Sequence, residues 1–222
     1  MSCLLQREIE KIKKCILALS AVVENRVQVS VKAVVERNAV LAQEVIDGDS
    51  EIDRMEVELE EDCLKILALH QPVAVDLRFM VSVIKINSEL ERIGDLAVNI
   101  GERALFLSSQ APIDIAFDFR GMSKNVKCML TMSLDSLVNM DATTATRVID
   151  SDDRIDALNR EMYHAVQRGI RKHPDRAEVL LHLWSASRHL ERIADHATNI
   201  AEDVIFLIQG TIVRHKSEFF HE

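Results

Sequence analysis

The feature that most constrains this chain is a six-residue stretch that occurs twice, 100 positions apart. Residues 90–95 read LERIGD, and residues 190–195 read LERIAD. The similarity continues in register, because Asn99 matches Asn199 and Glu102 matches Glu202. A repeat of this length indicates one supersecondary unit used twice, so both halves should share one architecture.

A second block of the repeat lies upstream with a different offset. Its three residues recur 103 positions later (156 − 53): Asp47, Ile52 and Asp53 match Asp150, Ile155 and Asp156. The halves therefore differ by three residues between the two blocks, and the sequence places that difference near residues 70–73. We expect a first repeat over 1–110 and a second repeat over 111–222 with a short C-terminal tail.

Composition narrows the fold and the possible partners. Only 6 Gly and 3 Pro occur in 222 residues, which favours long helices with few connections. The formal net charge of −9 argues against binding to nucleic acid, which needs a basic face. No stretch of 18 uncharged apolar residues and no signal peptide is present, and the four cysteines have no C-x-x-C spacing. These features predict a cytoplasmic protein without a transmembrane segment.

Apolar residues spaced three and four apart predict six helices. We expect them over 2–45, 50–69, 75–107, 117–148, 152–172 and 176–208, with a linker over 108–112 and a frayed tail from Thr211. Pro72 and Pro174 should close the second and fifth helices, since the residue before proline disfavours helix. The strict spacing in 75–107 and 176–208 is typical of a bundle seam. The predicted fold is all-α, with two tandem antiparallel three-helix bundles.

The acids of the repeated motif lie off this seam. With Leu90 and Ile93 on the seam, Glu91 and Asp95 face away from it, and the same holds for Asn99 and Glu102. A solvated helix face is the ordinary interpretation of such charges. However, two like charges four residues apart cost a helix about 0.2–0.5 kcal/mol. The full set nevertheless recurs in the second half, as Glu191, Asp195, Asn199 and Glu202.

Hairpin geometry adds partners for the acids of the first half. Residues equally distant from a hairpin turn lie at one level, because both helices rise equally per residue. About Pro72, Glu91 is level with residue 53 (2 × 72 − 91) and Asp95 with residue 49 (2 × 72 − 95). Both positions are aspartates, Asp53 and Asp49.

The same construction applies to the second half, where the turn lies between residues 173 and 174. Glu191 is level with Asp156 (347 − 191), and Asp195 is level with Asp152 (347 − 195). Four carboxylates at one site repel one another unless a cation lies among them. Oxygen ligands suit a hard ion such as Mg²⁺, Ca²⁺, Mn²⁺ or iron. The asparagine and glutamate that follow each motif are further candidate ligands: Asn99, Glu102, Asn199 and Glu202. His196, beside Asp195, is the histidine best placed to add an imidazole ligand.

The sequence resembles the PhoU family of phosphate-transport accessory and regulatory proteins over nearly its whole length. The resemblance rests on residues 52–53 followed by Cys63, then on 68–78 (ALHQPVAVDLR), 91–95 (ERIGD) and 191–203 (ERIADHATNIAED). It implies two three-helix bundles that carry multinuclear iron or zinc clusters on their outer surface. The ligands carried over from the two E-x-x-x-D motifs are Glu91, Asp95, Glu191 and Asp195.

The resemblance also implies a function. It implies negative regulation of phosphate uptake and of the phosphate-starvation response, through contact with the phosphate ABC transporter and a sensor histidine kinase. We expect a homodimer that is peripheral at the membrane through its partners. Residues 18–24 (ALSAVVE) lack the phenylalanine and the methionine-glycine pair usual in the family's first helix. A regulator of another anion transporter therefore remains an alternative.

Two other classes of protein would account for part of the sequence. A di-metal carboxylate enzyme of the four-helix type needs two inward-facing Glu-x-x-His motifs. Glu161 and His164 have this spacing, but Met162 takes the seam position, and the second instance, Glu218 with His221, lies beyond Gly210. A metal-free scaffold explains the seams but not the duplicated acids. No P-loop, nucleophile elbow or glycine-rich phosphate cradle is present, so we expect no enzymatic activity.

Overall fold

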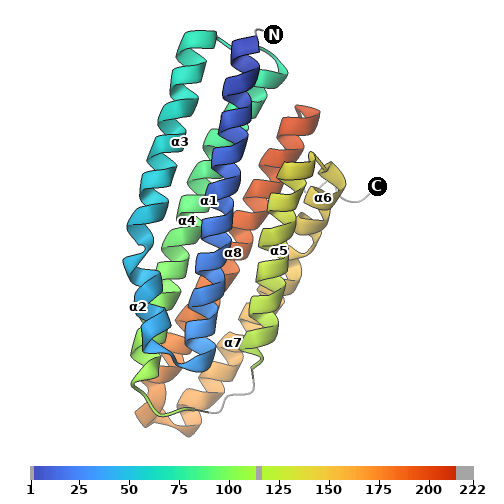
Figure 1. Cartoon of the computed structure of the whole chain (residues 1–222). Helices are drawn as coiled ribbons and strands as arrows, with labels where there is room; N and C mark the ends of the chain where they lie inside the picture. Colours follow the sequence, from blue (N-terminus) through green and yellow to red (C-terminus); the bar gives the residue numbers. More distant parts are fainter. Residues whose placement is uncertain (1–2, 114–116, 214–222) are drawn as a thin grey trace.

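The computed structural model describes residues 3–113 and 117–213. This part of the chain is helical and contains no strand, which confirms the predicted all-α class (Figure 1). The elements, in chain order, are α1 Cys3–Glu36, α2 Ala39–Asp47, α3 Asp49–His70, α4 Val75–Ser108, α5 Phe119–Asn139, α6 Ala142–Asp150, α7 Asp152–Lys172, the short 3₁₀ helix η1 Pro174–Arg176, and α8 Ala177–Gln209.

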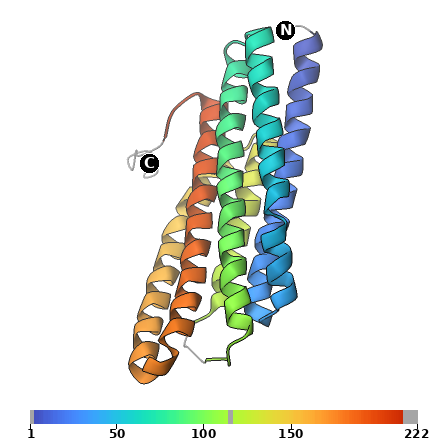
Figure 2. The same cartoon turned by 90° about the vertical axis from the view of Figure 1, so that its left-hand side faces the viewer.

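Each half forms three antiparallel columns, as the repeat predicted. In the first half α1 is one column, α2 and α3 together make the second, and α4 is the third (Figure 1). The second half repeats this plan with α5, with α6 and α7, and with α8. Helices α4 and α8 pack against each other at the centre, and α3 and α7 flank them (Figure 2). The hairpins that carry the repeated acids are therefore α3–α4 and α7–α8.

The position of the first turn in each half differs from the prediction. The predicted helices 2–45 and 117–148 each end about ten residues early, and the chain reverses at Arg37 and at Met140. These two residues have φ values of 53° and 52°, in the left-handed region that ends a helix. Asn38 and Asp141 then cap the next helix, because their side chains accept hydrogen bonds from backbone N–H groups. Both pairs are 103 residues apart (140 − 37).

The left-handed residues allow a matched stability test. A side chain in this region costs roughly 1–2 kcal/mol, which glycine avoids. Met140→Gly should therefore raise the free energy of unfolding by about 0.5 kcal/mol after the entropy of the unfolded glycine is subtracted. Arg37→Gly relieves the same φ but removes guanidinium hydrogen bonds of 2.8 Å to the carbonyls of Leu107 and Gln110. It should lower the free energy by roughly 1–3 kcal/mol. Urea unfolding of both variants tests this, and two effects of the same sign would contradict it.

One continuous apolar core joins the two halves. Leu90 and Ile93 of α4 and Leu190 and Ile193 of α8 are fully buried within it. A close approach of α3 to α4 orients the first hairpin: a Cβ atom added at Gly94 would lie 2.9 Å from Cδ1 of Ile52. Because Asp53 follows Ile52 and Asp95 follows Gly94, this contact brings their backbones together.

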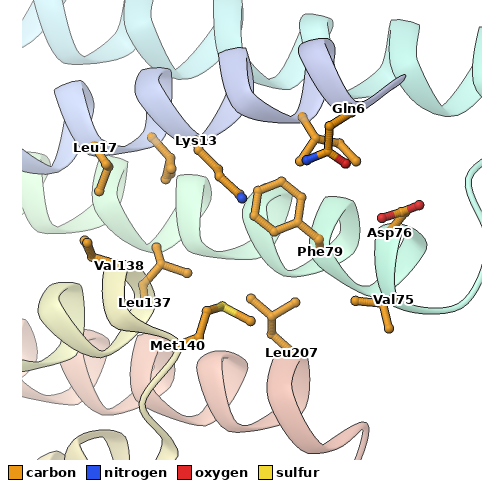
Figure 3. Close-up of a pocket in the computed structure, with 12 residues that line it drawn as sticks. Gln6, Lys13, Leu17, Val75, Asp76, Phe79, Leu137, Val138, Met140 and Leu207 are labelled. Carbon is orange, nitrogen blue, oxygen red and sulfur yellow. The ribbon is translucent and has the colours of Figure 1, made fainter. Parts of the chain in front are cut away.

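The core opens at one end of the molecule. There α1, α4, α5 and α8 leave an apolar groove of about 330 Å³, lined by Phe79, Leu137, Leu207 and others (Figure 3). The ammonium of Lys13 lies 5.8 Å from the centre of the Phe79 ring. Among the helices of the described ranges, none has the length and apolar character needed to cross a membrane.

Candidate metal centres

The first acidic cluster lies between α3 and α4. Asp49 and Asp53 stand one turn apart at the start of α3, and Glu91 and Asp95 stand one turn apart on α4. Asp49 and Glu91 are half-buried, whereas Asp53 and Asp95 are exposed. Oδ1 of Asp49 is buried and has no hydrogen-bond partner.

The acids of the first cluster lie close enough for their charges to raise the pKa values of Asp49 and Glu91. Burial, followed by the charges of Asp53 and Asp95, raises the pKa of Asp49, and the guanidinium of Arg26 opposes the rise. Burial, followed by the charges of Asp95, Glu56 and Asp53, also raises the pKa of Glu91. Hairpin geometry places Asp49 level with Asp95 and Asp53 level with Glu91, and the two residues of each pair also interact through their charges.

The second acidic cluster lies between α7 and α8. Burial, then the charges of Asp195 and Asp156, raises the pKa of Asp152 to about 6. The pKa of Glu191 is raised by burial and by the same two aspartates. The pKa of Asp195 is raised by burial and by Asp156. Oδ1 of Asp152, like that of Asp49, is buried without a partner.

The two clusters differ in their surroundings. The first contains Glu56, whose pKa is raised by burial and by the nearby Glu60 and Asp53. Sequence reasoning missed Glu56, although its place one turn beyond Asp53 on the same helix was a usable signal. The repeat-related positions of Arg26 and Glu56 (both + 103) hold Met129 and Asn159. The second cluster therefore has no counterpart of Arg26 or Glu56; there Arg188 and Arg192 oppose the rise in the pKa of Glu191, and Asp153 adds to the rise in the pKa of Asp152.

The remaining predicted ligands have other contacts. The amide of Asn99 donates to the backbone carbonyl of Asp95 (2.8 Å), and Glu102 accepts from Arg103 (2.9 Å). The amide of Asn199 reaches across to Glu89 on α4 (3.0 Å). Glu202 is half-buried on α8. None of Asn99, Glu102 and Asn199 is among the groups that shift the pKa values of Asp49, Glu91, Asp152, Glu191 and Asp195.

His196 does not join the second cluster through a hydrogen bond to its acids. Its Nδ1 lies 2.6 Å from Oε2 of Glu89, a carboxylate that is only 7% exposed. Burial acts to raise the pKa of Glu89, but hydrogen bonds to His196 and Asn199 outweigh it and hold the pKa below its usual range. Glu89, a residue that sequence reasoning missed, thus ties α4 to α8.

The donor chemistry of both clusters fits a cation. Each offers four carboxylates and one buried carboxylate oxygen without a hydrogen-bond partner, and burial and crowding raise the pKa of two carboxylates in the first cluster and of three in the second. Within residues 3–113 and 117–213, no three His, Cys, Asp or Glu side chains already surround a single point. An ion would therefore draw the carboxylates together, and its charge would replace their repulsion with attraction.

The raised pKa of Asp152 makes stability depend on pH in the metal-free protein. Because the folded pKa of about 6 exceeds the ordinary 3.8, the folded state holds the proton more tightly than the unfolded state. Stability should fall as pH rises from about 4 to about 6. Asp152→Asn removes this penalty, so the metal-free variant should melt higher than the wild type at pH 7. Thermal melts in chelator across this pH range test it, with the exposed Asp135→Asn as control. An equal or lower melting temperature for Asp152→Asn at pH 7 would contradict the repulsion.

Comparison with known proteins agrees with this architecture. The PhoU domain family model matches residues 16–104 and 119–204, one segment in each half. The chain is 38% identical over 210 residues to the phosphate-specific transport system accessory protein PhoU homolog of Aquifex aeolicus, covering 95% of both chains. It is 35% identical to the homolog of Pseudomonas aeruginosa, over 94% of this chain and 86% of that protein.

Solved structures show the same arrangement of helices. The crystal structure of PhoU from Pseudomonas aeruginosa has a TM-score of 0.88 and 34% identity, and the match covers 93% of this chain and 99% of that one. The regulatory protein PhoU from Streptococcus pneumoniae has a TM-score of 0.83 and 27% identity, over 94% and 99%. The twofold helical plan, the repeated acids and these matches together establish that this chain belongs to the PhoU family.

Proposed function

We propose that this protein is a metal-binding negative regulator of phosphate uptake and of phosphate-starvation signalling. It acts by contact with the phosphate ABC transporter and with a sensor histidine kinase. The observation that carries this proposal is the duplicated acidic cluster in a chain whose relatives, matched over nearly their full length, are named phosphate transport accessory proteins.

The metal would be held by the two acidic clusters. Asp49, Asp53, Glu91 and Asp95 are the ligands of one site, and Asp152, Asp156, Glu191 and Asp195 are those of the other. Carboxylates accommodate iron and zinc as well as Mg²⁺, Mn²⁺ or Ca²⁺. When bound, the ion supplies positive charge that links α3 to α4 and α7 to α8. It thereby fixes the face that those helices present to a partner.

We propose that the protein acts through contact with its partners and has no enzymatic turnover. The outward orientation of its Glu-x-x-His motif supports this proposal. Glu161 and His164 are both exposed, while Met162 between them is buried. A di-metal oxidase needs the opposite orientation. The other instance of the motif, Glu218 with His221, lies outside the described residues. We further propose a cytoplasmic homodimer that reaches the membrane only through its partners.

Deletion of the gene tests the proposed function. The deletion strain should take up phosphate and express phosphate-responsive genes even when phosphate is abundant, because the negative regulator is gone. A plasmid copy of the wild type should restore repression, whereas Asp95→Asn combined with Asp195→Asn should restore little. Asp135→Asn combined with Asp175→Asn removes two exposed acids elsewhere and should restore it fully.

The same deletion strain tests the alternative function, which is regulation of another anion transporter. If uptake and transcription in the deletion strain match the parent at every phosphate concentration, phosphate regulation is wrong for this chain. A change confined to the uptake of another anion would instead assign the protein to that transporter.

A further inference from the structure

Polar side chains cross the interface between α4 and α8 at one level, which covers residues 82–89 and 196–203, about two turns of each helix. The ammonium of Lys85 lies 3.1 Å from Oδ1 of Asp203, whose side chain is 2% exposed. The imidazole of His196 lies 2.6 Å from Glu89, and the hydroxyl of Ser82 donates to the backbone carbonyl of Asp203. Each buried acid at this level therefore has a cation or a hydrogen-bond donor as its partner.

The internal repeat places a second set at the related level of the same interface, with different chemistry. The positions 100 residues after Ser82, Lys85 and Glu89 hold His182, Ser185 and His189. The positions 100 residues before Asp203 and His196 hold Arg103 and Leu96. Both buried acids of the first set are thus replaced by basic or imidazole side chains. The second set therefore keeps hydrogen-bond donors but has no carboxylates that correspond to Glu89 and Asp203.

Unpartnered nitrogen atoms mark this second level. Nε of Arg103, Nδ1 of His182 and Nδ1 of His189 are all buried without a hydrogen-bond partner. The ring of His182 stacks on Phe106 with centroids 3.8 Å apart, and Oγ of Ser185 lies 3.3 Å from Nε2 of His189. Buried polar atoms without a partner are costly, so a native structure that keeps three of them together calls for an explanation.

Positive charge gathers around these atoms. The guanidinium groups of Arg103, Arg192 and Arg188 lie close enough to His189 for their charges to act on its ring. Burial and the charge of Arg103 lower the pKa of His182. Glu102 neutralises part of this charge, since it accepts a hydrogen bond from Nη2 of Arg103 at 2.9 Å, but it leaves Nε of Arg103 unpaired.

We propose that Arg103, His182 and His189 form a binding site for an oxyanion between α4 and α8. A phosphate or carboxylate group offers oxygen atoms that accept hydrogen bonds from a guanidinium and from imidazole N–H groups. The site is reached along the side chain of Arg103, which is 30% exposed. Nδ1 of His182 and Nδ1 of His189 are buried in this structure, so donation to the anion requires each ring to rotate. The site is separate from the acidic clusters and does not depend on the proposed metal.

Equilibrium dialysis with radiolabelled inorganic phosphate tests the site. A chelator in the buffer prevents phosphate from binding to metal at the acidic clusters. The wild type should bind phosphate saturably, and Arg103→Gln and His189→Gln should each weaken binding at least tenfold. The exposed Arg171→Gln should bind as the wild type does, and so should Asp95→Asn with Asp195→Asn. If Arg103→Gln does not fold, Arg103→Lys replaces it, since it keeps the charge but lacks the Nε donor.

Competition separates the possible sources of the anion. Displacement of labelled phosphate by sulfate but not by acetate would support a free tetrahedral anion as the ligand. Stronger displacement by acetate would support a carboxylate, such as an acidic side chain of a partner. Absence of saturable binding of phosphate, sulfate and acetate would overturn the proposal. Equal phosphate binding by the wild type, Arg103→Gln and His189→Gln would also overturn it.

Discussion

Asp95→Asn combined with Asp195→Asn should abolish most metal-dependent stabilisation while the helical fold survives. A cation present at 100 times its dissociation constant adds about 2.7 kcal/mol at each site, or about 5.4 kcal/mol for two sites, which corresponds to a rise in melting temperature on the order of 10–20 °C. Each substitution keeps the shape of the side chain but removes one negative charge from its cluster. Both residues are exposed, so the core is untouched.

The measurement is a thermal melt followed by circular dichroism, with metal and with chelator. Asp135→Asn combined with Asp175→Asn is the matched control, because it changes net charge equally away from both clusters. Its metal-induced shift should equal that of the wild type. An equal shift for the cluster variant and the wild type would show that the acids are not ligands. Loss of the circular dichroism signal in chelator at low temperature would show that the acids are structural.

Leu90→Ala should destabilise both halves together by about 3 kcal/mol. Leu90 of α4 is fully buried in the main core, and Leu→Ala at such sites costs roughly 2–5 kcal/mol through lost burial and the cavity left behind. The only tryptophan, Trp184, lies in the second half. Trp184 packs on a smaller cluster of Met162, Val166 and Leu180, and Leu183 contacts both this cluster and the main core. A cavity in the first half should therefore shift the unfolding transition that Trp184 fluorescence reports.

Fluorescence and circular dichroism followed along one urea titration supply the test. The two transitions should coincide in the wild type and move together in Leu90→Ala. The exposed Leu64→Ala serves as the control and should shift neither by much. A Trp184 transition that stays in place while the circular dichroism transition splits would show two independently stable bundles.

The acidic clusters could be predicted because they depend on local geometry. The turns at Pro72 and at residues 173–174 fix which residues of each hairpin are level, and the rise per residue is the same in every helix. Asp49 and Asp53 were therefore found opposite Asp95 and Glu91. Their rotation about the helix axis depends on packing, such as the contact of Ile52 with Gly94, which spacing alone does not give.

The turns at Arg37 and Met140 could not be predicted from apolar spacing. Ala33 and Val34 before the first turn and Ala42 and Val45 after it are all buried, so the helical pattern continues across the reversal. A residue other than glycine with a positive φ cannot be recognised from the spacing of apolar residues. The signal lay in Asn38 and Asp141, two capping residues at the repeat offset of 103.

The contacts between the two halves were also beyond sequence reasoning. Glu89 and His196 are separated by 107 residues, and the repeat relates each of them to a residue of a different kind. The internal symmetry therefore predicts that α4 and α8 have equivalent roles, but not which polar groups meet between them.

Anomalous X-ray scattering at the iron or manganese edge, from crystals of the metal-loaded protein, tests the central claim most directly. We predict two peaks, one among Asp49, Asp53, Glu91 and Asp95 and one among Asp152, Asp156, Glu191 and Asp195. Both should weaken in crystals transferred to lower pH, since carboxylates must be ionised to bind metal. An anomalous map without peaks at these clusters, or with its peaks only elsewhere on the molecule, would contradict the assignment.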